Sequence, residues 1–598
     1  MSAPRASDSR GHDTSSGAWT ARHTLALATI AAFAVVHLLP FRTYLTDDTF
    51  IHLQFAKNLI AGHGFSFNAG EPTYGATSPL WVFLLAAAGL VVPGAGQTPA
   101  DASFVPALAW AAKWIGAAAT VLSVILLARI GRTLEWSANL SLVPAALLAA
   151  HAWSARWAIS GMETPLVLFL VVASFHALAR ALLRGASAWP AGILLGLATL
   201  ARPECWILIG LALVAVWTGI PARRARAWIG VACGALLVVG PWLALAWAWF
   251  QRLTPNTSAA KAGVLLDPSL GLSALQASIR AFLATDAFAI GFAVVSLAVA
   301  GPGLFRIESP ARRAFWLFVF FWPVALVMGY VVGGVQVVSR YLVPAVPSVI
   351  LLGTAAAFWC APQLLSPLRK ILGKPTVSRA EAPRARAAAV LALALFATAQ
   401  NVAVTALLSA PHARRHTEGL FDSLGQLGVW ARTSTPPGTF FAVPDIGAFG
   451  YYSDRRVLDL YGLVTPGMSP VTVREGYDAV VARLLFEGIG RPEYLIDRAQ
   501  RPARLADPDD PENPYHFLRS VEIPDLGITR PATYVYSLYT IDWALYDRLH
   551  PRLASHPVEF SGDRRYDRKR LEADQGALGG GTNRIGQNSL PSQASSSL

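Results

Sequence analysis

The chain has 598 residues, of which 54% are hydrophobic and only 14% are charged. Soluble domains carry about 25% charged residues, so this composition excludes an ordinary soluble protein. The net charge of +13 does not indicate nucleic-acid binding, because the arginines gather in short loops between apolar runs and form no basic stripe with interleaved aromatic residues.

Residues 1–22 are polar and show no signal-peptide cleavage site, so we expect a cytoplasmic tail followed by a retained span. Apolar runs recur up to Leu408 and, at about 20 residues per span, predict about eleven transmembrane helices. The predicted spans are 23–41, 104–127, 139–157, 165–180, 189–201, 205–219, 228–249, 284–304, 315–334, 341–361 and 388–408.

Basic residues decide the predicted orientation of these spans. They cluster before the first span and after the second, fourth, sixth and eighth, and most densely in the loop 362–387. All of them fall on one side if the N-terminus is cytoplasmic, as the positive-inside rule requires. We therefore place the first loop, 42–103, and the chain after residue 408 outside the cytoplasm.

The first outer loop opens on two adjacent carboxylates, Asp47 and Asp48, where the first span leaves the bilayer. Carboxylates near a membrane often mark function. The pair could be a catalytic base, a cation site or a helix cap, and a base there could deprotonate an acceptor hydroxyl. The pattern of 49–60 predicts an amphipathic helix in the membrane interface, and 80–92 is too short to span.

Further polar residues are predicted on the same outer side. Arg202, Arg340 and Lys261 could bind a lipid phosphate, or the two arginines could extend to the outer head groups. Glu163 could bind substrate or complement a helix dipole. A site for a divalent cation at Asp47, Asp48 and Glu163 is an open alternative. No spacing of histidines or cysteines predicts a structural metal site.

After Leu408 the composition changes. Residues 409–574, with β-rich pieces at 440–443 and 533–539, predict a soluble α/β or α+β domain, which the span count places outside the cytoplasm. Asp445 and Gly447 form a strand-to-turn element that either shapes the domain or helps to bind an acceptor. The segment 575–598 is rich in Gly, Ser, Asn and Gln and is predicted to be disordered.

Several of these segments resemble a known family. The sequences 45–51, 62–71 and 77–81 are similar to the first periplasmic loop of polyprenyl-phosphate-dependent glycosyltransferases of the GT-C fold, above all the terminal arabinofuranosyltransferases of cell-wall arabinan. The resemblance covers about 25–560, and none of its motifs is specific for the sugar. It continues at 160–165, 201–204, 253–257, 260–261, 444–452 and 457–463.

The resemblance implies an enzyme of the bacterial inner membrane, with 23–408 as a GT-C-like catalytic domain and 409–574 as a periplasmic domain. Asp47 would be the general base and Asp48 a partner that orients acceptor or donor. The donor would be a polyprenyl-phosphate sugar such as arabinofuranose, the acceptor an envelope glycan or lipid, and no nucleotide sugar would be needed. The implied substrate-binding residues are His63, Glu71, Glu163, Asn256 and Asp445.

Two other functions fit the composition. A transporter or flippase of a lipid-linked precursor is compatible with many spans, although such proteins place charges near the midplane on broken helices of two related halves, and no half-repeat is visible here. A non-catalytic assembly factor whose outer domain binds glycan is the third possibility.

Overall fold

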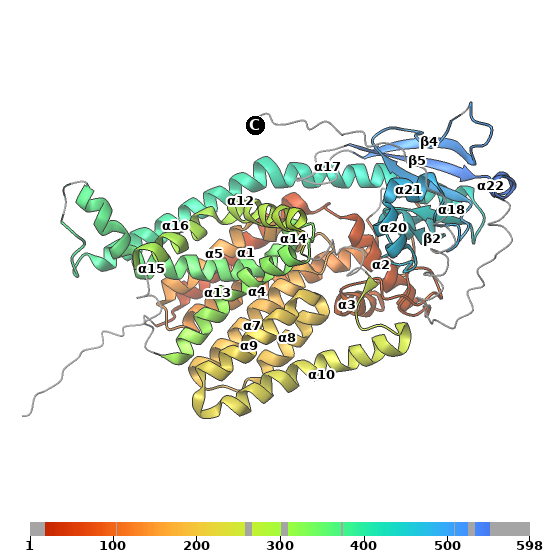
Figure 1. Cartoon of the computed structure of the whole chain (residues 1–598). Coiled ribbons are helices and arrows are strands. Elements are labelled where there is room, and N and C mark those ends of the chain that lie inside the picture. The colour runs from red at the N-terminus through yellow and green to blue at the C-terminus, as the bar shows by residue number, and fades with distance from the viewer. Residues whose placement is uncertain are drawn as a thin grey trace, which may run out of the picture. The chain divides into compact units, whose positions relative to one another are not determined.

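The computed structural model describes residues 18–102, 105–256, 266–300, 309–371, 373, 375–507, 509–523 and 533–550. A bundle of long helices fills most of Figure 1, and a small sheet domain lies at one end of it. The bundle contains α1 (Ala21–Leu38), α4 (Ala107–Thr133), α5 (Ala138–Ala150), α6 (Ala152–Ala158), α7 (Thr164–Arg184), α8 (Trp189–Ala201), α9 (Trp206–Gly219), α10 (Arg224–Phe250), α12 (Pro268–Ala300), α13 (Pro310–Val332), α14 (Ser339–Leu342), α15 (Val346–Ile371) and α16 (Ala382–Val404).

Each of the eleven predicted spans overlaps a helix of this bundle. By length and hydropathy, eight helical stretches of the described residues could cross a membrane, while α5, α8 and the stretch 203–219 are shorter apolar helices. The polytopic helical fold is therefore confirmed, and the number of eleven spans stays a prediction. The run 80–92 coincides with α3 (Pro79–Gly89), whose 11 residues are too few to span a bilayer.

One predicted span, 139–157, is two helices. His151 has extended backbone angles and separates α5 from α6. Its ring accepts a hydrogen bond from the backbone N–H of Ser154, which caps α6, and its Nε2 contacts the carboxylate of Asp286 on α12 at 3.1 Å. Periodicity could not reveal this break, because both halves are apolar.

The predicted helix after the carboxylate pair is α2 (Asp47–Ile60), which packs against protein on its polar as well as its apolar face, and its place in the membrane interface stays a prediction. Residues 49–58 are all buried, the polar ones included. Asn58 donates to the carbonyls of Ser66 and Phe67, and Lys57 pairs with Asp454 of the sheet domain at 2.6 Å. The polar face of α2 thus packs on protein, which supplies the hydrogen bonds that head groups would otherwise provide.

The sheet domain has five strands in the order β2-β1-β3-β5-β4. β1 (Phe440–Val443) lies between β2 (Arg456–Asp459) and β3 (Tyr494–Ala499) and is parallel to both, while β5 (Tyr534–Ile541) is antiparallel to β3 and β4 (Tyr515–Ile523). This mixed sheet confirms the predicted small α/β or α+β domain. Its helices are α18 (Gln426–Ser434), α19 (Gly447–Ser453), α20 (Met468–Glu475), α21 (Tyr477–Ala482) and α22 (Trp543–Leu549), and α17 (Ala410–Leu420) leads into it from α16.

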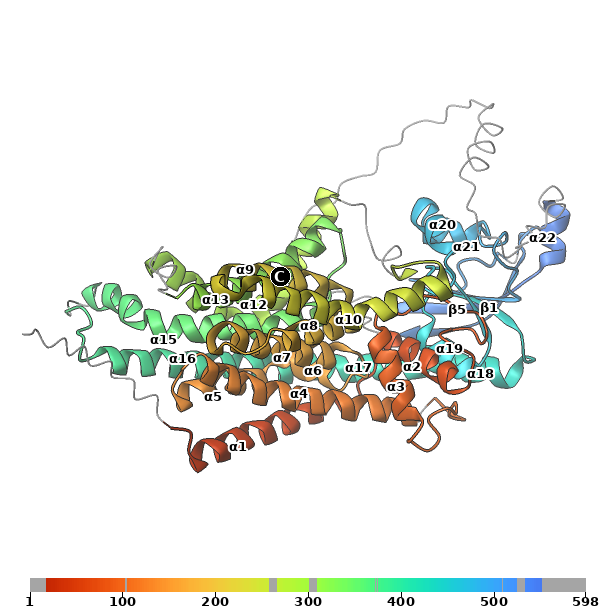
Figure 2. The same cartoon turned by 90° about the horizontal axis from the view of Figure 1, so that it is seen from below.

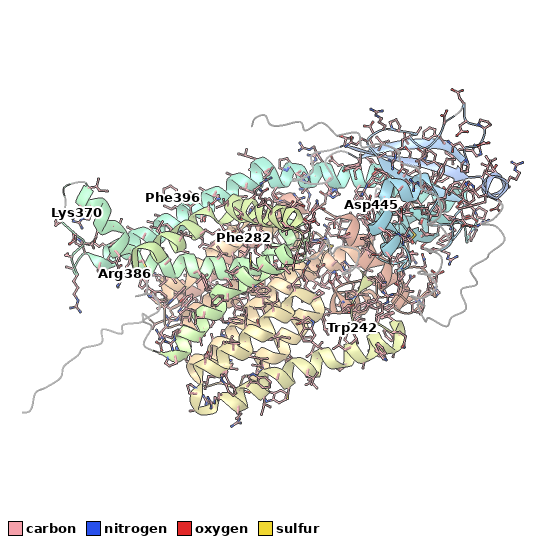
Figure 3. All side chains as sticks on the ribbon, viewed as in Figure 1. Trp242, Phe282, Lys370, Arg386, Phe396 and Asp445 are labelled. Carbon is pink, nitrogen blue, oxygen red and sulfur yellow. The ribbon has the colours of Figure 1, made fainter. Side chains whose placement is uncertain are left out.

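The basic loop 362–387 and the sheet domain lie at opposite ends of the bundle. Lys370 and Arg386 lie at the end away from the sheet domain, and Asp445 lies within the sheet domain at the other end (Figure 3). Figure 2 shows α2 and α3 beside the sheet domain as well. The predicted topology requires the basic loop 362–387 and the first outer loop at opposite ends, and the structure has that arrangement; which end faces the cytoplasm stays a prediction.

Candidate active site

A cavity of about 320 Å³ opens where the bundle meets α2 and the first outer loop. It is lined by side chains from α2, from the loop at 75–77, from the start of α7, from the turn between α8 and α9, and from α13 and α14. Its ionisable and aromatic lining residues include Asp48, Glu163, Arg202, Glu204, Tyr330, Arg340 and Tyr341. Residues from seven separate parts of the sequence, Leu463 of the sheet domain among them, therefore line one cavity, and its charged side chains lie in a mostly apolar wall.

Asp48 contributes the carboxylate of α2 to this cavity. It forms an ion pair with Arg340 of α14. The guanidinium of Arg340 is nearly buried and lies over the rings of Tyr341 and Trp157, at 5.2 and 5.7 Å. Asp48 is the more exposed partner, with 32% of its side chain accessible against 9% for Arg340, so its carboxylate can be reached from the cavity.

Arg202, at the end of α8, is held by two carboxylates. It donates to Glu163 at 2.9 Å and forms a two-pronged contact with Glu204 at 2.6 and 3.2 Å. Its guanidinium stacks 4.5 Å from the ring of Tyr341. Only 10% of the side chain is exposed, so the guanidinium of Arg202 lies in the wall of the cavity.

The cavity holds more negative than positive charge. Three carboxylates face two guanidinium groups among its described lining residues. A bound phosphate would add further negative charge, so its binding calls for an additional cation. Lys261, which the sequence predicts in that role, lies outside the described residues. Among the residues that the structure does describe, no group of three or more His, Cys, Asp or Glu is placed to hold a metal ion.

Asp47 points away from this cavity, toward the sheet domain. Its two carboxylate oxygens accept backbone hydrogen bonds from Gly447 and Ala448, at 2.9 and 2.7 Å, in the first turn of α19. A Cβ atom on Gly447 would lie 1.9 Å from the carbonyl oxygen of Asp47, so only glycine permits this approach. The N-cap of α2 is Thr46, and Asp47 and Asp48 occupy the first turn that follows it.

The surroundings of Asp47 raise its pKa to about 7. Burial is the largest cause, because the charged form loses water, and the nearby charge of Asp445 acts in the same direction. The two backbone hydrogen bonds from α19 stabilise the charged form and offset part of this rise, to which Asp48 adds a smaller contribution. A carboxylate with this pKa can exchange a proton near neutral pH.

The other predicted residues lie outside the cavity. Asn256 is buried and donates to Thr73 and to the carbonyl of Leu463, at 3.1 and 3.2 Å, which ties the loop after α10 to the sheet domain. Glu71 pairs with Arg456 at the surface, and His63 is exposed. The structure gathers Asp48, Glu163, Arg202 and Arg340 around the cavity, as the predicted topology requires. It places Asp47 and Asp445 beside each other.

Sequence reasoning did not select Glu204, Tyr330 and Tyr341 as site residues, although all three line the cavity. Glu204 follows Arg202 by two positions, and Tyr341 follows Arg340 directly, so their nearness to predicted residues was a usable signal. Tyr330 donates to Glu204 at 3.0 Å from near the end of α13, and no sequence pattern marked it.

Comparisons with known proteins bear on the fold. Residues 411–552 match the family described as "Domain of unknown function (DUF8728)", and a comparison with curated proteins gives no match. The structure of ArnT from Cupriavidus metallidurans bound to undecaprenyl phosphate is similar at a TM-score of 0.52 and 13% identity, over 87% of this chain and 98% of that chain. The apo structure of the same protein gives a TM-score of 0.52 and 13% identity, over 86% and 98%. The protein has a GT-C-like fold. The fold expected from the sequence is thereby confirmed, and the resemblance to arabinofuranosyltransferases stays a prediction.

Proposed function

We propose that the protein is a membrane glycosyltransferase that moves a sugar from a polyprenyl-phosphate donor to an envelope glycan or lipid at the outer face of the bacterial inner membrane. The observation that carries this proposal is the Asp48–Arg340 ion pair inside a cavity at the sheet-domain end of the bundle, with Asp47 adjacent in sequence. The similar fold of ArnT, whose structure holds undecaprenyl phosphate, supports a lipid-linked donor. Arabinofuranose is the first sugar to test, because of the sequence resemblance.

The two carboxylates have separate roles in this proposal. Asp48 holds Arg340, which with Arg202 and Lys261 binds the donor phosphate and stabilises the charge on the departing group. Asp47 takes the proton from the acceptor hydroxyl, whose oxygen attacks the anomeric carbon. The bond from that carbon to the phosphate oxygen breaks, and its electrons leave with the polyprenyl phosphate. The pKa of about 7 suits Asp47 for this proton transfer.

The placement of the charges favours transfer over transport. A transporter is expected to hold its charged site near the bilayer midplane, between two related halves. Here the cavity is lined by α2 and the first outer loop, at the end of the bundle that carries the sheet domain.

The test uses purified protein in lipid nanodiscs with polyprenyl-phosphate sugars, and with the matching nucleotide sugars as the alternative donors. We expect transfer from the lipid-linked donor only, and a fall of about 10²–10⁴-fold in rate for Asp47→Asn. Asp478→Asn is the matched control, because Asp478 is an exposed carboxylate of the sheet domain. Transfer from a nucleotide sugar without lipid carrier would contradict the proposed donor, and normal rates in both Asp47→Asn and Asp48→Asn would contradict the proposed roles.

A further inference from the structure

The register of the sheet brings three polar residues into one row. Ala442 of β1 pairs with Leu458 of β2 on one side and with Leu495 of β3 on the other. Three residues beyond each of these positions lie Asp445, Tyr461 and Arg498. The strands are parallel, so all three side chains belong to the carboxyl-end edge of the sheet.

The contacts confirm the row that the register indicates. Arg498 donates to both carboxylate oxygens of Asp445, at 2.9 and 2.8 Å, and to the hydroxyl of Tyr461 at 2.7 Å. Tyr536, directly opposite Arg498 on β5, donates its hydroxyl to Asp445 at 2.7 Å. Tyr461 stacks on Tyr477, with ring centroids 5.6 Å apart. The guanidinium of Arg498 therefore contacts one carboxylate and is surrounded by tyrosine side chains.

This edge of the sheet is where open α/β sheets bind ligands. The chain leaves β1 toward β2 and later returns to the other side of β1 to form β3, so the strand order reverses between β1 and β3. Ligands of such sheets bind beyond the carboxyl ends of the strands at that reversal. Asp445 and Arg498 flank it and are partly accessible, with 24% and 18% of their side chains exposed.

The row also adjoins the proposed base and the donor cavity. Asp445 is two residues before Gly447, whose backbone N–H binds Asp47, and Leu463, two residues after Tyr461, lines the cavity. A molecule held at the row would therefore lie close to Asp47 and to the cavity.

The charges at the row indicate which substrate it takes. Asp445 neutralises Arg498, and Asp47 is a second carboxylate nearby, so a phosphate is disfavoured. A sugar hydroxyl both donates and accepts hydrogen bonds, which suits a carboxylate beside a guanidinium. No acceptor among the described residues bonds the Nε–H of Arg498, which leaves that donor for a sugar hydroxyl.

We propose that Asp445, Tyr461 and Arg498 form the binding site for the uncharged terminal sugar of the acceptor, a role that rests on the transferase function proposed above. The sheet domain then presents the acceptor hydroxyl to Asp47, while the donor lies in the cavity of the bundle.

The test measures separate KM values for donor and acceptor with the full-length protein. The acceptor probe is the envelope glycan fraction extracted from a strain in which the protein is deleted, because unfinished acceptor accumulates there. The donor is the polyprenyl-phosphate sugar that supports transfer by the wild type. We expect Arg498→Lys to raise the acceptor KM about tenfold, as for loss of a hydrogen bond to a charged group, with the donor KM changed less than about twofold.

The control is Arg491→Lys. Arg491 makes a comparable set of contacts with Asp547 and Glu487, but it lies just before β3, at the opposite end of that strand from Arg498. This variant should leave both KM values unchanged. If Arg498→Lys does not fold, Tyr461→Phe is used to test the acceptor site instead. This substitution removes one hydroxyl and should raise the acceptor KM about threefold.

Two failures can be told apart. Absence of any transfer by the wild type overturns the proposed transferase function, and the acceptor site with it. Transfer by the wild type together with an unchanged acceptor KM in the folded variants, or an equal rise in donor KM, overturns the acceptor site alone.

Discussion

The contact between Asp47 and α19 gives a sharp prediction for Gly447→Ala. The added Cβ would lie 1.9 Å from the carbonyl oxygen of Asp47 and 2.8 Å from its Cγ, whereas non-bonded heavy atoms rest at about 3.5–4.0 Å. Helix α19 must therefore retreat by more than about 1 Å. Both hydrogen bonds to the carboxylate, now 2.9 and 2.7 Å, would then exceed the usual range.

The cost follows from those two bonds. Hydrogen bonds to a charged group contribute about 1.5–3 kcal/mol each, so the substitution should lower the free energy of unfolding by about 3 kcal/mol or more. The sheet domain stays attached through other contacts, among them Lys57 with Asp454 at 2.6 Å. The proposed base, Asp47, however, loses the two hydrogen bonds that hold its carboxylate in place, and we expect kcat/KM to fall about 100-fold.

Three measurements check this prediction: sugar transfer, thermal unfolding, and hydrogen exchange of the peptide 447–453, which should speed up. Gly488→Ala is the matched control, since a Cβ there meets nothing within 4 Å. If Gly447→Ala kept wild-type stability, exchange and kcat/KM, the contact would have neither the tightness nor the role that we assign to it.

Two further predictions concern pH and topology. The raised pKa of Asp47 predicts that kcat/KM increases with pH through about 7 and then levels off, because only the deprotonated carboxylate accepts a proton; Asp445→Asn removes a neighbouring charge and should move the midpoint to lower pH. A profile with no rise near neutral pH would contradict Asp47 as the base. In a protein without its native cysteines, Ala69→Cys should react with an impermeant reagent added outside, and Lys370→Cys only after permeabilisation. Both positions are exposed, and the reverse result would invert the predicted topology.

The sequence by itself determined the helical membrane architecture. A chain that crosses hydrocarbon must satisfy its backbone within each span, so every apolar run of sufficient length indicates a helix. All eleven predicted segments overlap helices for this reason. The pair Asp47–Asp48 could be singled out in the same way, because its position at the end of the first apolar run is visible in one dimension.

Only the tertiary structure decided what each of these carboxylates contacts. Consecutive residues of an α-helix point about 100° apart, since 3.6 residues complete a turn. Asp48 therefore faces Arg340 and the cavity, while Asp47 faces α19 of the sheet domain, some 400 residues later in the chain. The local sequence pattern predicts which residues share a face of the helix, but it does not predict which parts of the chain pack against each face.

The row of Asp445, Tyr461 and Arg498 was likewise hidden in the sequence. Its members are separated along the chain by helices of the sheet domain, and their alignment depends on which residues pair across β2, β1 and β3. A shift of one residue in the register between β1 and β3 would send the side chain of Arg498 to the other face of the sheet. That register is fixed by how the whole domain packs, so only the folded protein shows the three residues as one site.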